Sequence, residues 1–277
     1  MIQDVFGLPV NLASPFDFSF LGRYGRPFCV FDNLPDGDIC FGMESGQYGK
    51  LLCRFAGAPV LGALRRPEEA AAFLRQAAPL YTLLRHKNLI PLRGEGSVAG
   101  GYALIFRWPE GEKLHLADTK KRLRNQPLIT RLRMLDHVFD FHLNCARLGY
   151  TAVGFDDSRL LYDFDTDTVQ IINIDLYRPA PAVNPAEQTP GSARFRAPEE
   201  FEAGQLLDPL TTQYNMAALA FDVLGRDGLP YPDCWTASKS LYAIARRAMS
   251  PDRTQRYPGM GAFLYAWREA VKHSTVY

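Results

Sequence analysis

The stretch "RFRAPEEF" (residues 194–201) says more about the fold than any other part of this sequence. Three other stretches accompany it in a set order: "RHKNLIPL" (85–92), "ARLGYTAVG" (146–154) and "AMSPDRTQRYPGMGAF" (248–263). Any one of them alone would be a weak signal. Four of them, in this order and at these separations, strongly favour one architecture.

Length and composition are typical of a soluble globular protein. The chain has 277 residues, 47% hydrophobic and 22% charged, which is enough to bury the core of one large or two small domains. Lys and Arg number 31 against 30 Asp and Glu, so no basic field favours nucleic acid or an anionic membrane. No signal peptide is recognisable, and no stretch approaches the roughly 18 uninterrupted apolar residues of a membrane span. We therefore expect a cytoplasmic protein with neither nucleic acid nor a membrane as partner.

The first part of the chain is predicted to form an antiparallel sheet with one helix. Three segments mix β-branched, aromatic and Cys residues between turn formers: "PFCVFD" (27–32), "DICFGM" (38–43) and "KLLCRFAG" (50–57). A helix is expected from Pro67 to Leu84, because Pro stands in its first turn and acids follow; Pro79 should kink or end it. Two more strands are expected in "LIPLRGEG" and "GYALIFRW".

The rest of the chain is predicted to be mainly helical. A linker begins at Pro109, so we expect one domain in residues 1–108 and a second in residues 109–277. The second has a long helix over 128–149, with apolar residues at helical spacing and Gly149 as its stop. A short hairpin of "RLLYD" and "TVQIIN" follows, and the fold class is α+β.

The order of these parts resembles that of the protein kinase superfamily, and the chain looks like a group of bacterial serine/threonine-kinase-like proteins. "RFRAPEEF" is similar to the A-P-E sequence that closes the family's activation segment, and "ARLGYTAVG" has the spacing of its R-G-I-V-H-R-D. The resemblance implies a bilobal fold, with a small antiparallel lobe in residues 1–108 and a larger, mainly helical lobe in residues 109–277. Aminoglycoside and choline kinases share these lobes but lack the A-P-E sequence, which makes them a distant second.

The resemblance also implies a structural ion pair. In the family, the A-P-E Glu, here Glu199, pairs with an Arg that corresponds to Arg256. Breaking one partner of a buried pair costs on the order of 3–5 kcal/mol, so these residues have a structural role whether or not the protein is a catalyst. We expect them to lie within salt-bridge distance and largely buried.

The parts that the resemblance assigns to phosphate binding are altered. The glycine-rich turn corresponds to "NLPDGD" (33–38), which has one glycine, a proline without an N–H and acids facing an anion. An ordinary hairpin turn is the simpler interpretation. The strand Lys corresponds to Arg54, and its usual helix Glu corresponds to Ala77, so we expect Arg54 to lack that ion pair.

Adenine binding is allowed by the sequence and not required by it. The resemblance places Phe106 at the gatekeeper position and assigns the backbone groups that pair with a purine to Arg107, Trp108 and Pro109. Phe106 and Trp108 are equally well explained as core and groove aromatics.

The catalytic loop lacks its reacting groups. Gly154 corresponds to the catalytic Asp and has no side chain to orient a hydroxyl, while Arg159 replaces the metal-binding Asn with a cation that repels magnesium. Asp156 and Asp157 are candidates for recruitment, although a capped polar turn explains them as well. Thr212 corresponds to an Asp that normally braces this loop, and we expect that bracing to be lost.

The D-F-G metal motif fits the sequence in two frames. Spacing favours Asn173-Ile174-Asp175, which leaves no charged magnesium ligand at a standard position, and a shift of two residues starts the motif at Asp175 instead. We interpret the chain as a pseudokinase that acts as a binding, scaffold or allosteric regulatory module for an unknown protein partner, with binding of ATP in the cleft between the lobes possible and Mg²⁺ doubtful. The alternative is a slow, atypical Ser/Thr kinase that uses Arg54, Asp175 and either Asp156 or Asp157.

Overall fold

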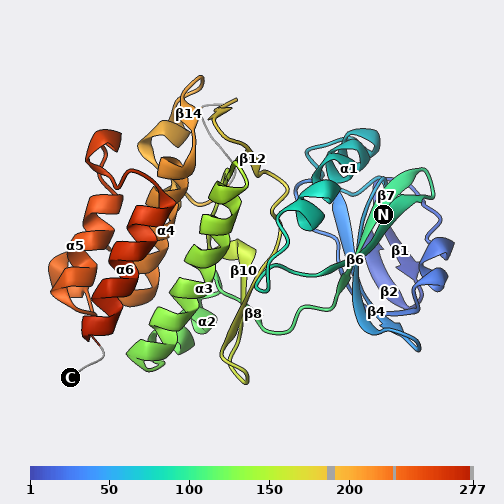
Figure 1. Ribbon diagram of the computed structural model, residues 1–277. Coiled ribbons are helices and arrows are strands. Elements are labelled where there is room, and N and C mark those ends of the chain that lie inside the picture. Colours follow the sequence, from blue (N-terminus) through green and yellow to red (C-terminus); the bar gives the residue numbers. More distant parts are fainter. Residues whose placement is uncertain (186–190, 227–228, 275–277) are drawn as a thin grey trace. The chain divides into compact units, whose positions relative to one another are not determined.

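The computed structural model describes residues 1–185, 191–226 and 229–274 and has a mixed α+β fold, as expected (Figure 1). The chain divides into two compact units: Met1–Arg85 with Ile90–Pro109, and His86–Leu89 with Glu110–Tyr277. The unit therefore changes after Pro109, one residue beyond the expected boundary. The short segment His86–Leu89 belongs to the second unit, which the sequence did not indicate.

A five-stranded antiparallel sheet forms the centre of the first unit, in the order β3-β4-β5-β7-β6. Its strands are β3 (Arg26–Phe31), β4 (Asp38–Ser45), β5 (Gly49–Ala56), β6 (Leu92–Val98) and β7 (Gly101–Arg107). Every neighbouring pair is antiparallel. All five strands expected from residue type and turn formers are present.

Both faces of this sheet are covered. Ile39, Phe41 and Met43 alternate along β4 and bury one face under the N-terminal elements β1 (Ile2–Val5), β2 (Leu8–Asn11) and η1 (Ser19–Arg23). Helix α1 (Pro67–Leu83) packs against β5 and β7, where Tyr81 meets Phe106 with ring centroids 4.9 Å apart. The N-terminal layer was not predicted.

Pro79 lies inside α1, which continues to Leu83, so of the two expected effects of this proline the end of the helix does not occur. Proline removes one backbone hydrogen bond from a helix. Beyond Pro79, Leu80 and Tyr81 are buried, and their packing holds the last turn in place.

Helix α4 (Pro209–Leu224) forms the core of the second unit. Its side chains are buried from Thr211 to Leu224 except for Tyr214, as expected for a helix surrounded by others. The helices packed against it are α2 (Ala117–Arg124), α3 (Leu128–Arg147), α5 (Lys239–Ala248) and α6 (Met260–Ser274). No helix in the described ranges is long and apolar enough to span a membrane.

Short strands and turns hold the loops of this unit. A three-stranded sheet joins β8 (Glu112–Lys113), β10 (Leu160–Asp163) and β11 (Thr168–Ile171); β9 (Tyr150–Thr151) pairs with β12 (Arg178–Pro179), and β13 (Ala182–Val183) with β14 (Leu206–Leu207). The 3-10 turns are η2 (Asp157–Arg159), η3 (Ala193–Phe195), η4 (Pro198–Phe201), η5 (Pro232–Cys234) and η6 (Arg253–Gln255).

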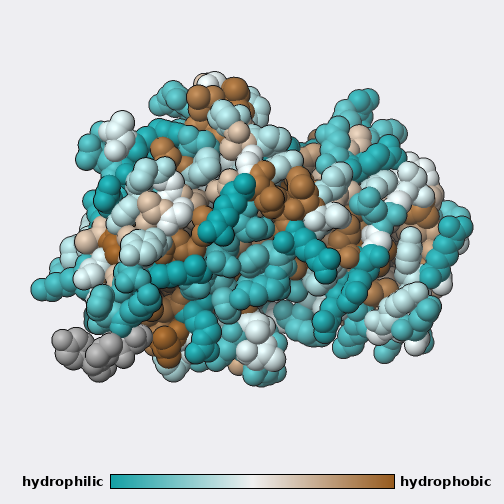
Figure 2. Space-filling view, viewed as in Figure 1, coloured by the Kyte–Doolittle hydropathy of each residue, from teal (hydrophilic) through white to brown (hydrophobic). Residues whose placement is uncertain are grey.

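The surface is mostly hydrophilic, with an apolar patch over β14 at the top of the view in Figure 2. Val183 and Leu206 are opposite each other in the β13–β14 pair, and the side chain of Phe201 lies in the adjacent turn η4. These three residues are 62%, 51% and 43% exposed. Contiguous exposed apolar side chains of this kind often mark interaction surfaces.

Candidate functional site

The residues predicted to be functional fall in two groups. The second unit contains Gly154, Asp156, Asp157, Arg159, Asn173, Asp175, Glu199 and Arg256, and the first contains Arg54, Phe106, Arg107, Trp108 and Pro109. The geometry of each group is described within its own unit.

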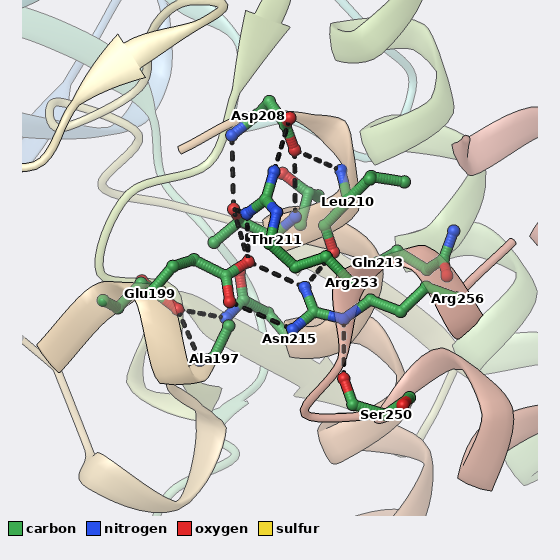
Figure 3. A network of polar contacts seen from close by, with 12 residues as sticks. Ala197, Glu199, Asp208, Leu210, Thr211, Gln213, Asn215, Ser250, Arg253 and Arg256 are labelled. Atoms are coloured by element: carbon green, nitrogen blue, oxygen red, sulfur yellow. Dashed lines mark hydrogen bonds and ion pairs between the residues drawn. The ribbon is translucent and has the colours of Figure 1, made fainter. Parts of the chain in front are cut away.

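A buried ion pair joins Glu199 and Arg256 in the second unit (Figure 3). Nη1 of Arg256 donates to Oε1 of Glu199 at 2.7 Å and Nη2 donates to Oε2 at 3.0 Å, which is the two-pronged geometry of a strong pair. The Arg256 and Glu199 side chains are 0% and 4% exposed. The ion pair predicted from the sequence is present and buried.

Arg256 also donates hydrogen bonds to backbone carbonyl oxygens. Its Nε donates to the carbonyl oxygen of Ser250 at 2.8 Å, and Nη1 also donates to that of Leu210 at 3.1 Å. The guanidinium lies 5.1 Å from the ring centroid of Tyr214. The cation is therefore held by two backbone segments as well as by Glu199.

A second arginine connects this pair to the start of α4. Nη1 of Arg253 donates to Oε1 of Glu199, and Nη2 donates to Oδ2 of Asp208, both at 2.6 Å. Oδ1 of Asp208 caps α4 by accepting the N–H of Leu210 at 2.8 Å. Burial alone would raise the pKa of Glu199, but the hydrogen bonds and charge of Arg256 outweigh it and lower that pKa.

Glu200, which the sequence analysis did not single out, links three segments. It is fully buried, and its carboxylate accepts the Ala197 N–H at 2.8 Å, Nδ2 of Asn215 at 2.7 Å and the Gly154 N–H at 3.4 Å. Burial raises the pKa of Glu200. The only sequence signal for it was the second acid of "APEE".

Asp156 holds the chain together around Gly154. Its Oδ1 accepts the N–H and hydroxyl of Ser158 at 3.0 and 2.5 Å, and Oδ2 accepts the N–H of Ser192 at 2.8 Å. A Cβ on Gly191 would lie 2.8 Å from the carbonyl oxygen of Gly154, so Gly191 itself packs closely against the loop. Both oxygens of Asp156 are bound in the way that the capped-turn interpretation describes.

Asp157 belongs to a buried charge cluster that the sequence did not reveal. Oδ2 of Asp157 pairs with Lys120 and, at 2.8 Å, with Arg194. Asp222 pairs with Arg124 and Arg194 at 3.0 Å, and with Lys120 at 3.4 Å. The cluster consists of two carboxylates and three cations from four separate segments. No local sequence pattern predicts contacts between segments so far apart.

Arg159 bridges the two segments to which the metal ligands were assigned. Its Nε donates to the carbonyl oxygen of Gly154 at 3.0 Å, and its Nη1 donates to that of Asn173. Asn173 has a φ of 53°, a left-handed conformation that Asn tolerates better than most residues. Asp175 is buried, and its carbonyl oxygen accepts from Arg178 at 2.9 Å. The Arg159 guanidinium therefore places a fixed positive charge between Gly154 and Asn173.

The expected loss of bracing by Thr212 was wrong. Its hydroxyl accepts the N–H of Ala152 at 3.1 Å and shares a hydrogen bond with the hydroxyl of Thr151 at 2.9 Å. A neutral hydroxyl can accept a backbone N–H as a carboxylate does, although with less energy. Thr212 and Glu200 thus each hold one N–H of the loop.

In the first unit, Arg54 pairs with an acid of the neighbouring strand. Its Nε donates to Oδ2 of Asp38 at 2.5 Å, and both residues are buried. Ala77 is buried in α1, and Glu69, nearer the start of that helix, bonds to Arg66 at 2.6 Å. The sequence analysis had placed Asp38 beside the phosphates and had not anticipated this pair.

The turn of residues 33–38 folds against the start of α1. Asp36 pairs with Arg65, and the carbonyl oxygen of Pro35 accepts the N–H of Leu64 at 2.9 Å. A Cβ on Gly37 would lie 3.3 Å from the Cβ of Ala70. The turn is therefore bound within its own unit rather than left open to receive an anion.

The segment 106–109 offers few free backbone donors. The N–H of Arg107 donates to Pro91 and that of Trp108 to Lys50, both at 3.1 Å, while Pro109 has no N–H. Phe106 is buried in the core, as one of the two interpretations of that residue held.

The ring of Trp108 packs against Phe28 and over Gly42 of β4. Its centroid lies 5.0 Å from that of Phe28, and a Cβ on Gly42 would come within 2.7 Å of both rings. These side chains fill the space above Gly42.

The chain matches no protein-family model and no curated protein sequence. Within the described ranges, no group of three or more His, Cys, Asp or Glu side chains is arranged to hold a metal ion. The residues assembled around Gly154 can brace backbone and neutralise charge. Their carboxylates are engaged in those contacts.

Proposed function

We propose that this protein is a pseudokinase, a bilobal member of the protein kinase superfamily that acts as a binding, scaffold or regulatory module for a protein partner. The order of its elements supports the family: five antiparallel strands with one helix, then a long helix, a β-hairpin and a helical remainder. The buried pair of Glu199 and Arg256, expected from two separate motifs, supports it independently.

The hydrogen bonds of Arg159 are the main observation in support of the proposed lack of catalysis. Phosphoryl transfer needs divalent cations held by carboxylate or amide ligands beside the loop that orients the attacking hydroxyl. Here a guanidinium, bonded to Gly154 and Asn173, lies between the corresponding positions. A fixed positive charge at this place disfavours a metal ion.

The acids near Gly154 do not replace the missing base. A general base has to reach the proton that it removes and usually contributes about 10²–10⁴-fold to the rate. Both oxygens of Asp156 accept hydrogen bonds from the chain, and Asp157 is buried between Lys120 and Arg194. Recruiting either acid would break contacts that hold the loop.

Binding by this module is proposed to need no nucleotide. The turn of residues 33–38 is bonded within its unit, and Arg107 and Trp108 donate their N–H groups to neighbouring strands. A ligand at a hundred times its Kd would stabilise the protein by about 2.7 kcal/mol. We expect no such stabilisation in a thermal-shift assay with ATP or ADP, with or without magnesium or manganese.

Transfer of phosphate from radiolabelled ATP tests the proposal directly. The wild type is compared with Asp156→Ala, Asp157→Ala and Asp175→Ala, first in magnesium and then in manganese. We expect background incorporation in all four proteins, against about 1–100 turnovers per second for the family. Autophosphorylation near that rate, abolished by one of the substitutions, would refute the pseudokinase proposal, establish the slow-kinase alternative and identify the recruited acid.

A further inference from the structure

A hollow at the surface of the second unit is lined by one end of α5 and the turn that follows it. Its volume is about 530 Å³, and its lining residues are Arg246, Arg247, Ser250, Pro251, Thr254 and Gln255. The size lies within the range of small-molecule sites. Its lining consists of two arginines, three uncharged polar residues and one proline, and it contains no carboxylate.

Several hydrogen-bond donors of this hollow have no partner among the described residues. Arg246 forms no hydrogen bond or ion pair with any described residue, and neither do the hydroxyl of Ser250 and the side-chain amide of Gln255. Such groups remain available to a ligand. By contrast, the hydroxyl of Thr254 donates to Asp252 and can only accept.

Contacts within the protein hold the Arg247 side chain in place before any ligand binds. Its Nε donates to the carbonyl oxygen of Gln255 at 3.1 Å, and its guanidinium lies 4.2 Å from the ring centroid of Tyr257. These contacts, with the Tyr257 hydroxyl also beside the guanidinium, fix its plane. Less conformational entropy is lost when a fixed group binds a ligand.

The local charge favours an anion. Arg246 and Arg247 contribute two positive charges, and Asp252, behind Thr254, contributes one negative charge. The nearby Arg253 and Arg256 are balanced by the carboxylates of the Glu199 network. A guanidinium fork matches the oxygens of a phosphate group, which has about two negative charges and three strong acceptors.

We propose that this hollow binds the phosphate group of a ligand, with Arg246 and Arg247 taking its charge and Ser250 and Gln255 completing its hydrogen bonds. The inference does not depend on the pseudokinase proposal. A carboxylate, with one charge and two oxygens, satisfies only part of this donor set and binds more weakly.

Titration of the ¹⁵N-labelled protein with inorganic phosphate at constant ionic strength tests the site. Acetate serves as the carboxylate probe, and a phosphoserine peptide with its unphosphorylated form distinguishes a peptide source from free phosphate. Arg246→Gln and Arg247→Gln are each expected to weaken phosphate binding about tenfold, since a hydrogen bond to a charged group contributes at least a factor of that order. Arg133→Gln removes an exposed, unpaired arginine elsewhere in this unit and should change Kd by less than about twofold.

Tighter binding of the phosphopeptide than of inorganic phosphate would assign the site to phosphorylated protein segments, and equal binding would assign it to free phosphate. Both results support a phosphate site. Absence of saturable binding, acetate binding as tight as phosphate, or equal losses in Arg246→Gln and Arg133→Gln would overturn the proposal. The two variants change exposed side chains, so their melting temperatures should match that of the wild type.

Discussion

The Glu199–Arg256 pair and the loop of residues 152–159 lie in the same unit, and both bury carboxylates beside cations. The pair joins two positions that each stand in a recognisable motif, and its bond needs only those two side chains. The acids of the loop are bound by residues from other segments, among them Lys120 and Arg194. A contact between two motif positions can thus be predicted from the sequence, whereas the contacts of this loop depend on partners that no motif contains.

The largest loss of stability is expected when the buried pair of Glu199 and Arg256 is broken. Arg256→Ala leaves the Glu199 carboxylate buried with Arg253 and the Thr211 hydroxyl, so we expect a loss of about 3–5 kcal/mol in the free energy of unfolding. Urea denaturation measures it, with the exposed Arg147→Ala as the matched control. A loss below about 1 kcal/mol would show that the pair does not anchor this unit.

The charge cluster should be less sensitive, because its cations share two carboxylates. Asp157→Ala removes the pairs to Lys120 and Arg194, but both can still reach Asp222, so we expect a loss of about 2 kcal/mol. The exposed Asp233→Ala should cost less than about 0.5 kcal/mol. Equal effects of the two substitutions would mean that the cluster contributes nothing to stability.

A smaller effect is expected at Arg159. Arg159→Met removes the bonds to Gly154 and Asn173 but keeps the bulk of the side chain, so the loss should be about 1 kcal/mol. The variant should still transfer no phosphate, because Gly154 supplies no base. A gain of kinase activity in this variant would identify Arg159 as an inhibitor of a competent site.

The adjacent acids Glu199 and Glu200 should respond to pH in opposite directions. The lowered pKa of Glu199 gives stability that is present above the ordinary carboxyl pKa of about 4.5 and is lost as pH falls through the lower folded value. The raised pKa of Glu200 gives stability that is full below about 4.5 and is lost as pH rises through the higher folded value.

Unfolding free energies of Glu199→Gln and Glu200→Gln, measured from acid to neutral pH, check this pair of signs. Relative to its variant, the wild type should gain stability with rising pH at Glu199 and lose it at Glu200. Parallel curves for the two variants would contradict the opposite pKa shifts.

Much of the first unit and one contact of the second could be predicted. The first three strands of the sheet mix β-branched, aromatic and Cys residues between turn formers, a local signal that tertiary contacts did not override. The N-terminal layer was missed, because its segments are placed by burial of one face of the sheet and not by local propensity. Glu200, Asp222 and Lys120 were missed because their partners lie far away in the sequence.

The sequence by itself determined which chemical groups are lacking at particular positions and which two residues form the buried ion pair. Gly154 has no side chain, Arg159 is a cation, Pro109 has no N–H, and Glu199 and Arg256 stand in motifs that call for each other. These are properties of residue type, which folding does not change.

Only the tertiary structure decided what the remaining charged residues do. Asp38 bonds Arg54 rather than facing an anion, Asp156 holds Ser192, and Arg159 spans the carbonyl groups of Gly154 and Asn173. The physical reason is that a buried charge is tolerated only beside a partner. Which partner reaches it depends on how distant segments pack, and that information is spread over the whole chain.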